Sequence, residues 1–166
     1  PLTSPDIIGS LTDLSVISES SQDAIYSSHN IEHLYPHEVP TALQEFLRVL
    51  KPDGFLLITC PDLQSIAEQI AADKLLDPAY ISEAGAITPL DMVFGLRSEL
   101  RRGNHWMAHK CGFTASALTG SLKEAGFAQI ACRRRGANLF DLWALATKSK
   151  WSDQRLRETV KLLFPT

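Results

Sequence analysis

The sequence predicts an α/β domain whose sheet is mainly parallel and ends in an antiparallel hairpin. Over most of the 166 residues, short apolar runs alternate with stretches of helical periodicity, which is typical of strand–helix–strand units. Near the end, two β-favouring segments, 128–134 and 139–147, are separated only by Arg135-Gly136-Ala137-Asn138. So short a connection favours a hairpin. The length suits one domain with its own core.

The expected strands are short and apolar. Asp6–Gly9 and Ala24–Ser28 are the first two, and Phe55–Cys60 is a continuous apolar run of the kind buried on both faces of a sheet. Ligands of open α/β sheets bind outside the carboxyl ends of the strands. We therefore expect functional residues just after Ser28 and just after Cys60.

The expected helices are marked by periodicity and by capping residues. Apolar side chains recur at i, i+3, i+4 and i+7 between Pro40 and Leu50, and the sequence 51–54 then predicts a turn. Asp62, Thr114 and Ser152 are N-cap candidates for helices that extend to about Leu76, to Ala125 before Gly126, and through the C-terminal residues.

Composition excludes several classes of protein. Hydrophobic residues make up 45%, charged residues 21%, and the net charge is −3, so we expect a globular chain that binds no nucleic acid. No apolar run is long enough to span a membrane, and the first residues lack a secretory signal, which predicts a cytoplasmic protein without membrane contacts. The three cysteines form no CxxC pair and are expected to be buried thiols.

Several segments resemble class I S-adenosylmethionine-dependent methyltransferases of the type 11 group. Asp23–Leu34 is similar to the end of the fourth strand of that family, with its "D-x-I-x-x-x-H-x-x-E-H" pattern, and Leu43–Ile58 is similar to the following helix, "R-V-L-K-P-G-G" turn and fifth strand. His109–Thr114 and Leu122–Phe127 are similar to downstream stretches of a bacterial branch. The resemblance implies a Rossmann-like sheet and methyl transfer from S-adenosylmethionine to a small-molecule, saccharide or other metabolite acceptor.

The sequence also departs from the family. The nine glycines are scattered and no Gly-x-Gly occurs, whereas the family holds its cofactor with a Gly-rich loop after its first strand. Compared with the family, the sheet is therefore expected to be truncated at its N-terminus, with residues 1–150 as a partial domain, 77–112 as an irregular insertion or flap, and 151–166 as a C-terminal helix. The strand at 24–28 would then be an edge, which predicts a homodimer formed through that edge.

The resemblance also suggests site residues. It places Ser28, His29 and Asn30 beside the cofactor, while Ser10 stands where the family often has an acidic residue near the adenine, and Asp13 is the nearest carboxylate. His109 is the candidate general base, because imidazole titrates near neutral pH, and His29 is the second catalytic candidate.

Two alternatives remain open at this level. His29-Asn30-Ile31-Glu32-His33 matches the H-x-x-E-H pattern of zinc hydrolases. That pattern must lie within a helix, however, and here a strand runs directly into His29, so no metal ligand is predicted. The other alternative is a non-catalytic dimeric scaffold that has lost its cofactor cradle.

Overall fold

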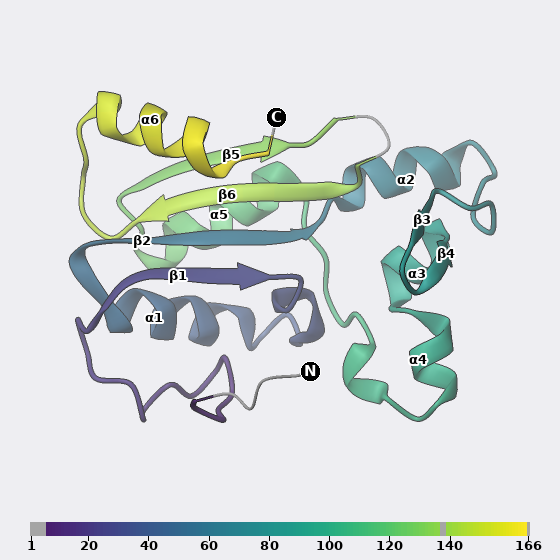
Figure 1. Ribbon diagram of the computed structural model, residues 1–166, viewed down its shortest axis with the longest axis horizontal. Coiled ribbons are helices and arrows are strands. Elements are labelled where there is room, and N and C mark those ends of the chain that lie inside the picture. Colours follow the sequence, from purple (N-terminus) through teal and green to yellow (C-terminus); the bar gives the residue numbers. More distant parts are fainter. Residues whose placement is uncertain (1–5, 137–138, 166) are drawn as a thin grey trace.

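The computed structural model describes residues 6–136 and 139–165. Its centre is a four-stranded mixed sheet with the order β1-β2-β6-β5 (Figure 1). The four strands are β1 (Gln22–Ser28), β2 (Leu50–Pro61), β5 (Gln129–Arg134) and β6 (Asp141–Thr147). β1 and β2 are parallel, while β6 is antiparallel to both β2 and β5. The parallel pair is thus β1 and β2, and the predicted antiparallel hairpin, β5 and β6, forms the other side of the sheet.

Helices cover both faces of the sheet (Figure 1). The covering helices are α1 (Val39–Val49), α5 (Ala115–Ala125) and α6 (Asp153–Leu163). Helix α2 (Leu63–Ala71) follows β2 beyond the end of the sheet (Figure 1), and a short 3-10 helix η1 (Ile31–His33) follows β1. α1 and α5 pack on one face around the main apolar cluster, and α6 packs on the other face around a smaller one. The result is a three-layer α/β/α arrangement.

The central residues of β2, Phe55–Ile58, show why this run is apolar. Leu56 and Ile58 point into the main cluster beneath α1 and α5, whereas Leu57 points to the opposite face and packs near Trp151 beside α6. Successive side chains of a strand alternate between faces, so a strand covered on both sides must be apolar at every position.

The capping residues have the predicted roles. The side chains of Asp62, Thr114 and Ser152 accept hydrogen bonds from backbone N–H groups in the first turns of α2, α5 and α6. Gly126 ends α5 in the left-handed conformation with φ of 107°. Helix α2 ends at Ala71 rather than near Leu76, and Asp73 then takes a positive φ of 59°.

Two other expectations were wrong. Residues 6–9 form no strand; the chain there makes only an isolated bridge between Ser10 and Asp13 and then runs along α1, where Arg48 donates to the Leu14 carbonyl. Residues 51–54 do not form a turn but belong to β2, opposite a register shift in β1. Gly54 allows a close backbone approach, since a Cβ there would lie 3.0 Å from the Asp23 carbonyl oxygen.

Residues 77–112, which we call the insert, lie beyond the carboxyl ends of β1 and β2 (Figure 1). The insert contains the hairpin β3 (Tyr80–Ser82) and β4 (Gly85–Ile87), the helices α3 (Pro89–Phe94) and α4 (Arg97–Arg101), and the 3-10 helix η2 (His105–Met107). The connection Ala137–Asn138 of the predicted hairpin lies outside the described residues.

Strand β1 is an edge of the sheet. It pairs with β2 on one side, and no other described strand pairs with it, so the Asp6–Gly9 segment does not cover it. Tyr26 on this strand is 61% exposed. Within the described ranges, no helix has the length and apolar character needed to cross a membrane.

Candidate functional site

A cavity of about 240 Å³ lies where the carboxyl ends of β1 and β2 meet the insert. The sequence indicates this end of the sheet, because open α/β sheets bind their ligands outside the carboxyl ends of the strands. The cavity is lined by the β1–η1 junction, the end of β2, the residue before β6, and the insert: His29, Glu32, His33, Pro61, Tyr80, Ser82, Ala84, Ile87, Asp91, Met92, Leu96, Met107, His109 and Phe140.

His29 occupies an unusual backbone conformation at the point where β1 ends. Its φ is +48°, in the left-handed region that L side chains rarely adopt. Phe140, across the cavity, also has a positive φ of 38°. Such conformations cost free energy and are frequent at functional sites, although Asp73 adopts one at the end of α2.

The His29 imidazole is half exposed, and its Nδ1 lies 3.5 Å from Oε1 of Glu32. The neighbouring Glu32 carboxylate raises the pKa of His29, while burial acts in the opposite direction. A carboxylate on Nδ1 favours the proton on that nitrogen and leaves the lone pair on Nε2. The pair therefore resembles the histidine–carboxylate pairs that orient a general base.

Glu32 itself is almost completely buried, with 1% of its surface exposed. Neither of its carboxylate oxygens has a hydrogen-bond partner among the described residues. Burying a carboxylate without such partners is costly, and structures keep one when a charged ligand or reaction uses it. In the sequence, Glu32 belongs to the H-x-x-E-H pattern, and the resemblance to methyltransferases implies no role for it.

His109 is brought to the cavity by the insert and is held at two points by α3. Its backbone N–H donates to the Phe94 carbonyl, and its Nδ1 lies 2.8 Å from the Met92 carbonyl oxygen. Burial lowers the pKa of His109, so the ring is neutral at neutral pH. The ring also packs edge-on against His33, with centroids 4.9 Å apart.

The other predicted residues contribute less. Ser28 is the last residue of β1, directly before His29, and its hydroxyl forms a hydrogen bond with the Thr59 hydroxyl of β2 at 3.0 Å. The Asn30 side chain accepts from Ser27 at 2.6 Å. Both side chains thus already hold the strand–helix junction together. Ser10 and Asp13 do not line this cavity, and their side chains bond within their own turn to Thr12 and Ser15.

The zinc-hydrolase pattern does not form the expected helix. Only Ile31–His33 is helical, as a single 3-10 turn, and His29 lies outside it with a left-handed backbone. The two histidines of the pattern are therefore not on one face of a continuous helix. This agrees with the strand that the sequence predicts before His29.

A second polar group stabilises the rim of the cavity. Asp91 and Thr88 form a capping box at the start of α3, and Arg97 donates to both Asp91 oxygens at 2.7 and 3.0 Å. Burial alone would raise the pKa of Asp91, but the hydrogen bonds from Arg97 and Thr88 outweigh it and hold this pKa well below its usual range. Both oxygens of the Asp91 carboxylate therefore have hydrogen-bond partners, whereas those of Glu32 have none among the described residues.

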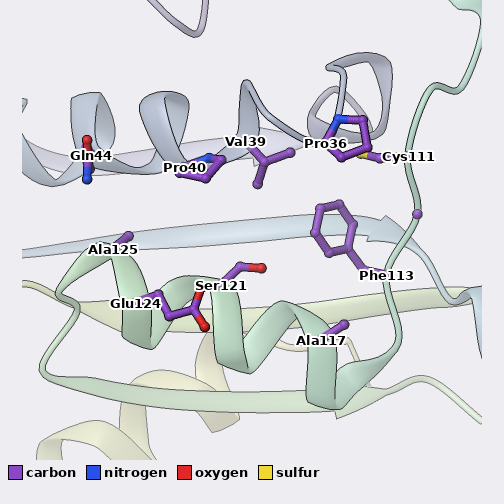
Figure 2. Close-up of a pocket in the computed structure, with 11 residues that line it drawn as sticks. Pro36, Val39, Pro40, Gln44, Cys111, Phe113, Ala117, Ser121, Glu124 and Ala125 are labelled. Carbon is purple, nitrogen blue, oxygen red and sulfur yellow. The ribbon is translucent and has the colours of Figure 1, made fainter.

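A larger cavity, of about 480 Å³, lies between α1 and α5 (Figure 2). Its walls are mainly apolar, with Val39, Phe113 and Ala117 among them, and Glu124 and Ser121 stand on the α5 side. Burial raises the pKa of the Cys111 thiol at one end to about 11, so this thiol is not a reactive thiolate. Its described lining brings no cluster of titratable groups together, so the smaller cavity is the candidate functional site.

Comparison with known proteins supports the fold. Residues 3–58 match the family described as the methyltransferase domain. Similar solved structures include a S-adenosylmethionine-dependent methyltransferase from Thermotoga maritima, with a TM-score of 0.54, 15% identity and coverage of 85% of this chain and 62% of that one. A search of curated proteins finds no match.

Two further similar structures have the same fold. The 1,6-didemethyltoxoflavin-N1-methyltransferase of Burkholderia thailandensis, solved with its substrate and S-adenosylhomocysteine, has a TM-score of 0.52, 18% identity and coverage of 84% of this chain and 48% of that one. A S-adenosylmethionine-dependent methyltransferase from Methanosarcina mazei has a TM-score of 0.51, 17% identity and coverage of 86% and 66%.

The chain spans less than two thirds of the length of each of these three structures. The predicted α/β fold, with fewer strands than the family's full sheet, is confirmed, and so is the resemblance that the motifs around His29 and Lys51–Gly54 suggested. Residues 3–58 therefore carry the sequence pattern of the methyltransferase domain family, and the described chain has the fold of S-adenosylmethionine-dependent methyltransferases.

Proposed function

We propose that this protein takes part in methyl transfer from S-adenosylmethionine to a small-molecule acceptor, with the reaction at the cavity that His29 and His109 line. The observation that carries the proposal is the His29–Glu32 pair, a histidine with a left-handed backbone that lies 3.5 Å from a buried carboxylate at the carboxyl end of a parallel strand. The family match over residues 3–58 supports the choice of cofactor. All three cysteines are free, which supports a reducing compartment such as the cytoplasm.

The described residues fit the reacting end of such a cofactor better than its whole length. The cavity of about 240 Å³ is smaller than the roughly 300–1,000 Å³ typical of complete ligand sites. Since the Ser28 and Asn30 side chains are engaged with Thr59 and Ser27, contacts to the cofactor would come from His29 and the backbone after β1. When bound, S-adenosylmethionine would supply the electrophilic methyl group.

His29 is the residue that we propose as the base. A hydroxyl or amine acceptor must lose a proton as its oxygen or nitrogen attacks the methyl carbon, and Nε2 of His29 would accept that proton. Glu32 would stabilise the resulting imidazolium at Nδ1. The insert would position the acceptor and exclude water, since proximity and alignment provide much of the rate enhancement in such a transfer.

Binding is tested by calorimetric titration of the chain with S-adenosylhomocysteine. We expect a dissociation constant below about 100 μM, which corresponds to about −5.5 kcal/mol. Absence of heat from folded protein would contradict the proposal and favour the non-catalytic scaffold. Activity is then followed as release of S-adenosylhomocysteine with a panel of hydroxyl- and amine-bearing metabolites.

The base is tested with His29→Asn. Asparagine tolerates the left-handed conformation, so this variant keeps the backbone of residue 29 and removes only the imidazole. We expect kcat to fall by about 10²- to 10⁴-fold with little change in stability. The matched control is His37→Asn, because His37 is exposed and does not line the cavity. Equal activities of the two variants would exclude His29 as the base.

We also propose that the free edge of β1 pairs with a second copy of the chain. An edge strand with an exposed Tyr26 invites such pairing. Light scattering should give a mass of twice 18.3 kDa, and Tyr26→Lys should shift it toward the monomer. A monomer at all concentrations would rule this out without affecting the proposed chemistry.

A further inference from the structure

Three side chains with metal-ligating atoms converge inside the cavity. One oxygen of Glu32 and one ring nitrogen each of His33 and His109 all lie within 4.8 Å of one another. Two of these residues are neighbours in η1, whereas His109 comes from the far end of the insert. The set differs from the H-x-x-E-H pattern because His109 takes the place of His29.

In each imidazole, a backbone carbonyl determines which nitrogen keeps its lone pair. Nδ1 of His33 lies 3.1 Å from the Ala108 carbonyl oxygen, and Nδ1 of His109 lies 2.8 Å from the Met92 carbonyl oxygen. A carbonyl oxygen can only accept, so Nδ1 carries the hydrogen in each ring and the lone pair of the neutral ring is on Nε2. Hydrogen bonds of this kind orient histidines that bind metals.

The third group is the buried carboxylate that lacks a hydrogen bond. Glu32 is 1% exposed, and His29 at 3.5 Å is the one cation that the described ion pairs assign to it. Oε2 has no such neighbour within the described chain. An ion of charge +2 between Glu32, His33 and His109 would provide the missing partner for this oxygen.

The backbone fixes the three residues before any ion binds. The Glu32 carbonyl accepts the N–H groups of Lys110 and Cys111 at 2.8 and 3.2 Å, which ties the end of the insert to η1. Ligand atoms around a tetrahedral zinc ion lie about 3.3 Å apart, given zinc–nitrogen distances of about 2.0–2.1 Å. Small side-chain rotations would therefore close the observed spread of 4.8 Å.

We propose that Glu32, His33 and His109 form a binding site for a divalent transition metal, with zinc as the best fit. Two neutral imidazoles and one carboxylate are a zinc ligand set, and they leave one coordination position open. All three ligands line the cavity, so the open position faces it. As an extension that rests on the proposed function, this position would bind the oxygen of a hydroxyl acceptor and favour its deprotonation by His29.

The test is a titration of metal-free full chain with ZnCl₂, in parallel with Co²⁺ followed by visible absorption. We expect one ion per chain and a dissociation constant for zinc below about 1 μM. His33→Ala and His109→Ala should each weaken binding by about 100-fold or more. The control His37→Ala should bind as the wild type, since that ring lies outside the cavity.

His29→Asn separates this site from the H-x-x-E-H pattern. If zinc binding survives in His29→Asn and is lost in His109→Ala, the proposed ligand set is correct; the reverse result overturns it. Weak binding in the wild type, or equal binding by all variants, also overturns it.

Glu32→Gln provides a measurement that does not depend on activity. Gln has nearly the same shape but no charge, so the metal-free variant should be at least as stable as the wild type, while the rise in melting temperature on adding zinc should disappear. A marked loss of metal-free stability would instead make Glu32 a structural partner of His29. If the chain binds zinc but not S-adenosylhomocysteine, the metal site stands and the proposed function is rejected. If it binds S-adenosylhomocysteine but not zinc, the metal site is rejected and the proposed function stands.

Discussion

The sheet layer is held by one large apolar cluster, whereas the insert combines a smaller apolar cluster around Ile87 and Met92 with polar and backbone contacts. Leu56, Ile58 and Leu142 in the sheet are fully buried within one continuous cluster. The insert instead exposes large apolar side chains, with Trp106 83% exposed and Ile81 74% exposed. Its shape depends on the small cluster that Ile87 and Met92 form with Phe140, together with a capping box, an ion pair and a few backbone hydrogen bonds. The part that positions His109 is therefore expected to open at a lower free energy than the sheet.

The largest expected effect is in the sheet. Leu142→Ala removes a fully buried side chain of β6, and we expect the free energy of unfolding to fall by about 3 kcal/mol. Urea denaturation measures this. Leu162→Ala, in the exposed part of α6, is the control and should change stability by less than about 0.5 kcal/mol. A small effect of Leu142→Ala would show that the sheet is not held by apolar burial.

Gly95→Ala tests the insert. A Cβ at this position would lie 2.1 Å from the Met107 carbonyl oxygen, and Gly95 has a φ of +98°. We expect the insert to lose about 2 kcal/mol of local stability, read as faster hydrogen exchange of its amides while the sheet remains protected. The control is Gly103→Ala, which shares a positive φ of +85° but meets nothing within 4 Å, so its cost is about 1 kcal/mol. Equal effects would mean that the contact with η2 does not stabilise the insert.

Asp91→Asn removes the charge that joins α3 to Arg97. Hydrogen bonds to charged groups contribute about 2 kcal/mol, and we expect slightly less here because the Arg97 side chain is half exposed. The folded-state pKa of Asp91 is lowered, so its contribution is complete above the unfolded pKa of about 4 and is lost as pH falls below it. The protection factors of the insert's amides, which compare the observed exchange rate with the intrinsic rate at the same pH, should therefore fall in acid in the wild type and depend less on pH in Asp91→Asn. Parallel curves for the two proteins would contradict this assignment.

The smallest effect should come from the helix caps. Ser152→Ala removes the side chain that accepts from the Arg155 N–H at 3.2 Å, and we expect a loss of about 1 kcal/mol. Ser152→Asp should restore most of it, because aspartate is an equivalent N-cap. Thermal unfolding of the three proteins measures both changes. If Ser152→Asp is as unstable as Ser152→Ala, the cap is not what Ser152 contributes.

The contrast between the sheet and the insert also explains which parts of the fold could be predicted from the sequence. The spacing of apolar residues and the capping residues are local signals. The bounds of α1 and α5, and the end of α5 at Gly126, could therefore be predicted almost to the residue. The Asp6–Gly9 strand was wrong because a short apolar run becomes a strand only if a neighbouring strand pairs with it, and the described sheet offers none there. The prediction of a turn at 51–54 was wrong. Close packing of Gly54 against the Asp23 carbonyl favours glycine, and so does a turn, so the two cannot be told apart in the sequence.

The candidate site could be predicted only in part. His29 was found because it follows β1 directly, and His109 because the family resemblance marked its segment. Their surroundings depend on the insert, whose short elements carry weak periodicity. The burial of Glu32 and the contact of His33 with the Ala108 carbonyl join residues far apart in sequence, and no local pattern predicts such a pairing.

The two hydrogen bonds that the Glu32 carbonyl accepts from Lys110 and Cys111 also limit how a molecule can reach the cavity at the end of β1. Swinging the whole insert outward would break both bonds and separate His109 from η1. The β3–β4 hairpin, by contrast, makes backbone hydrogen bonds only to itself and to Ala79 within the described chain. Passage in and out should therefore occur beneath that hairpin, past Tyr80, while the histidines keep their places.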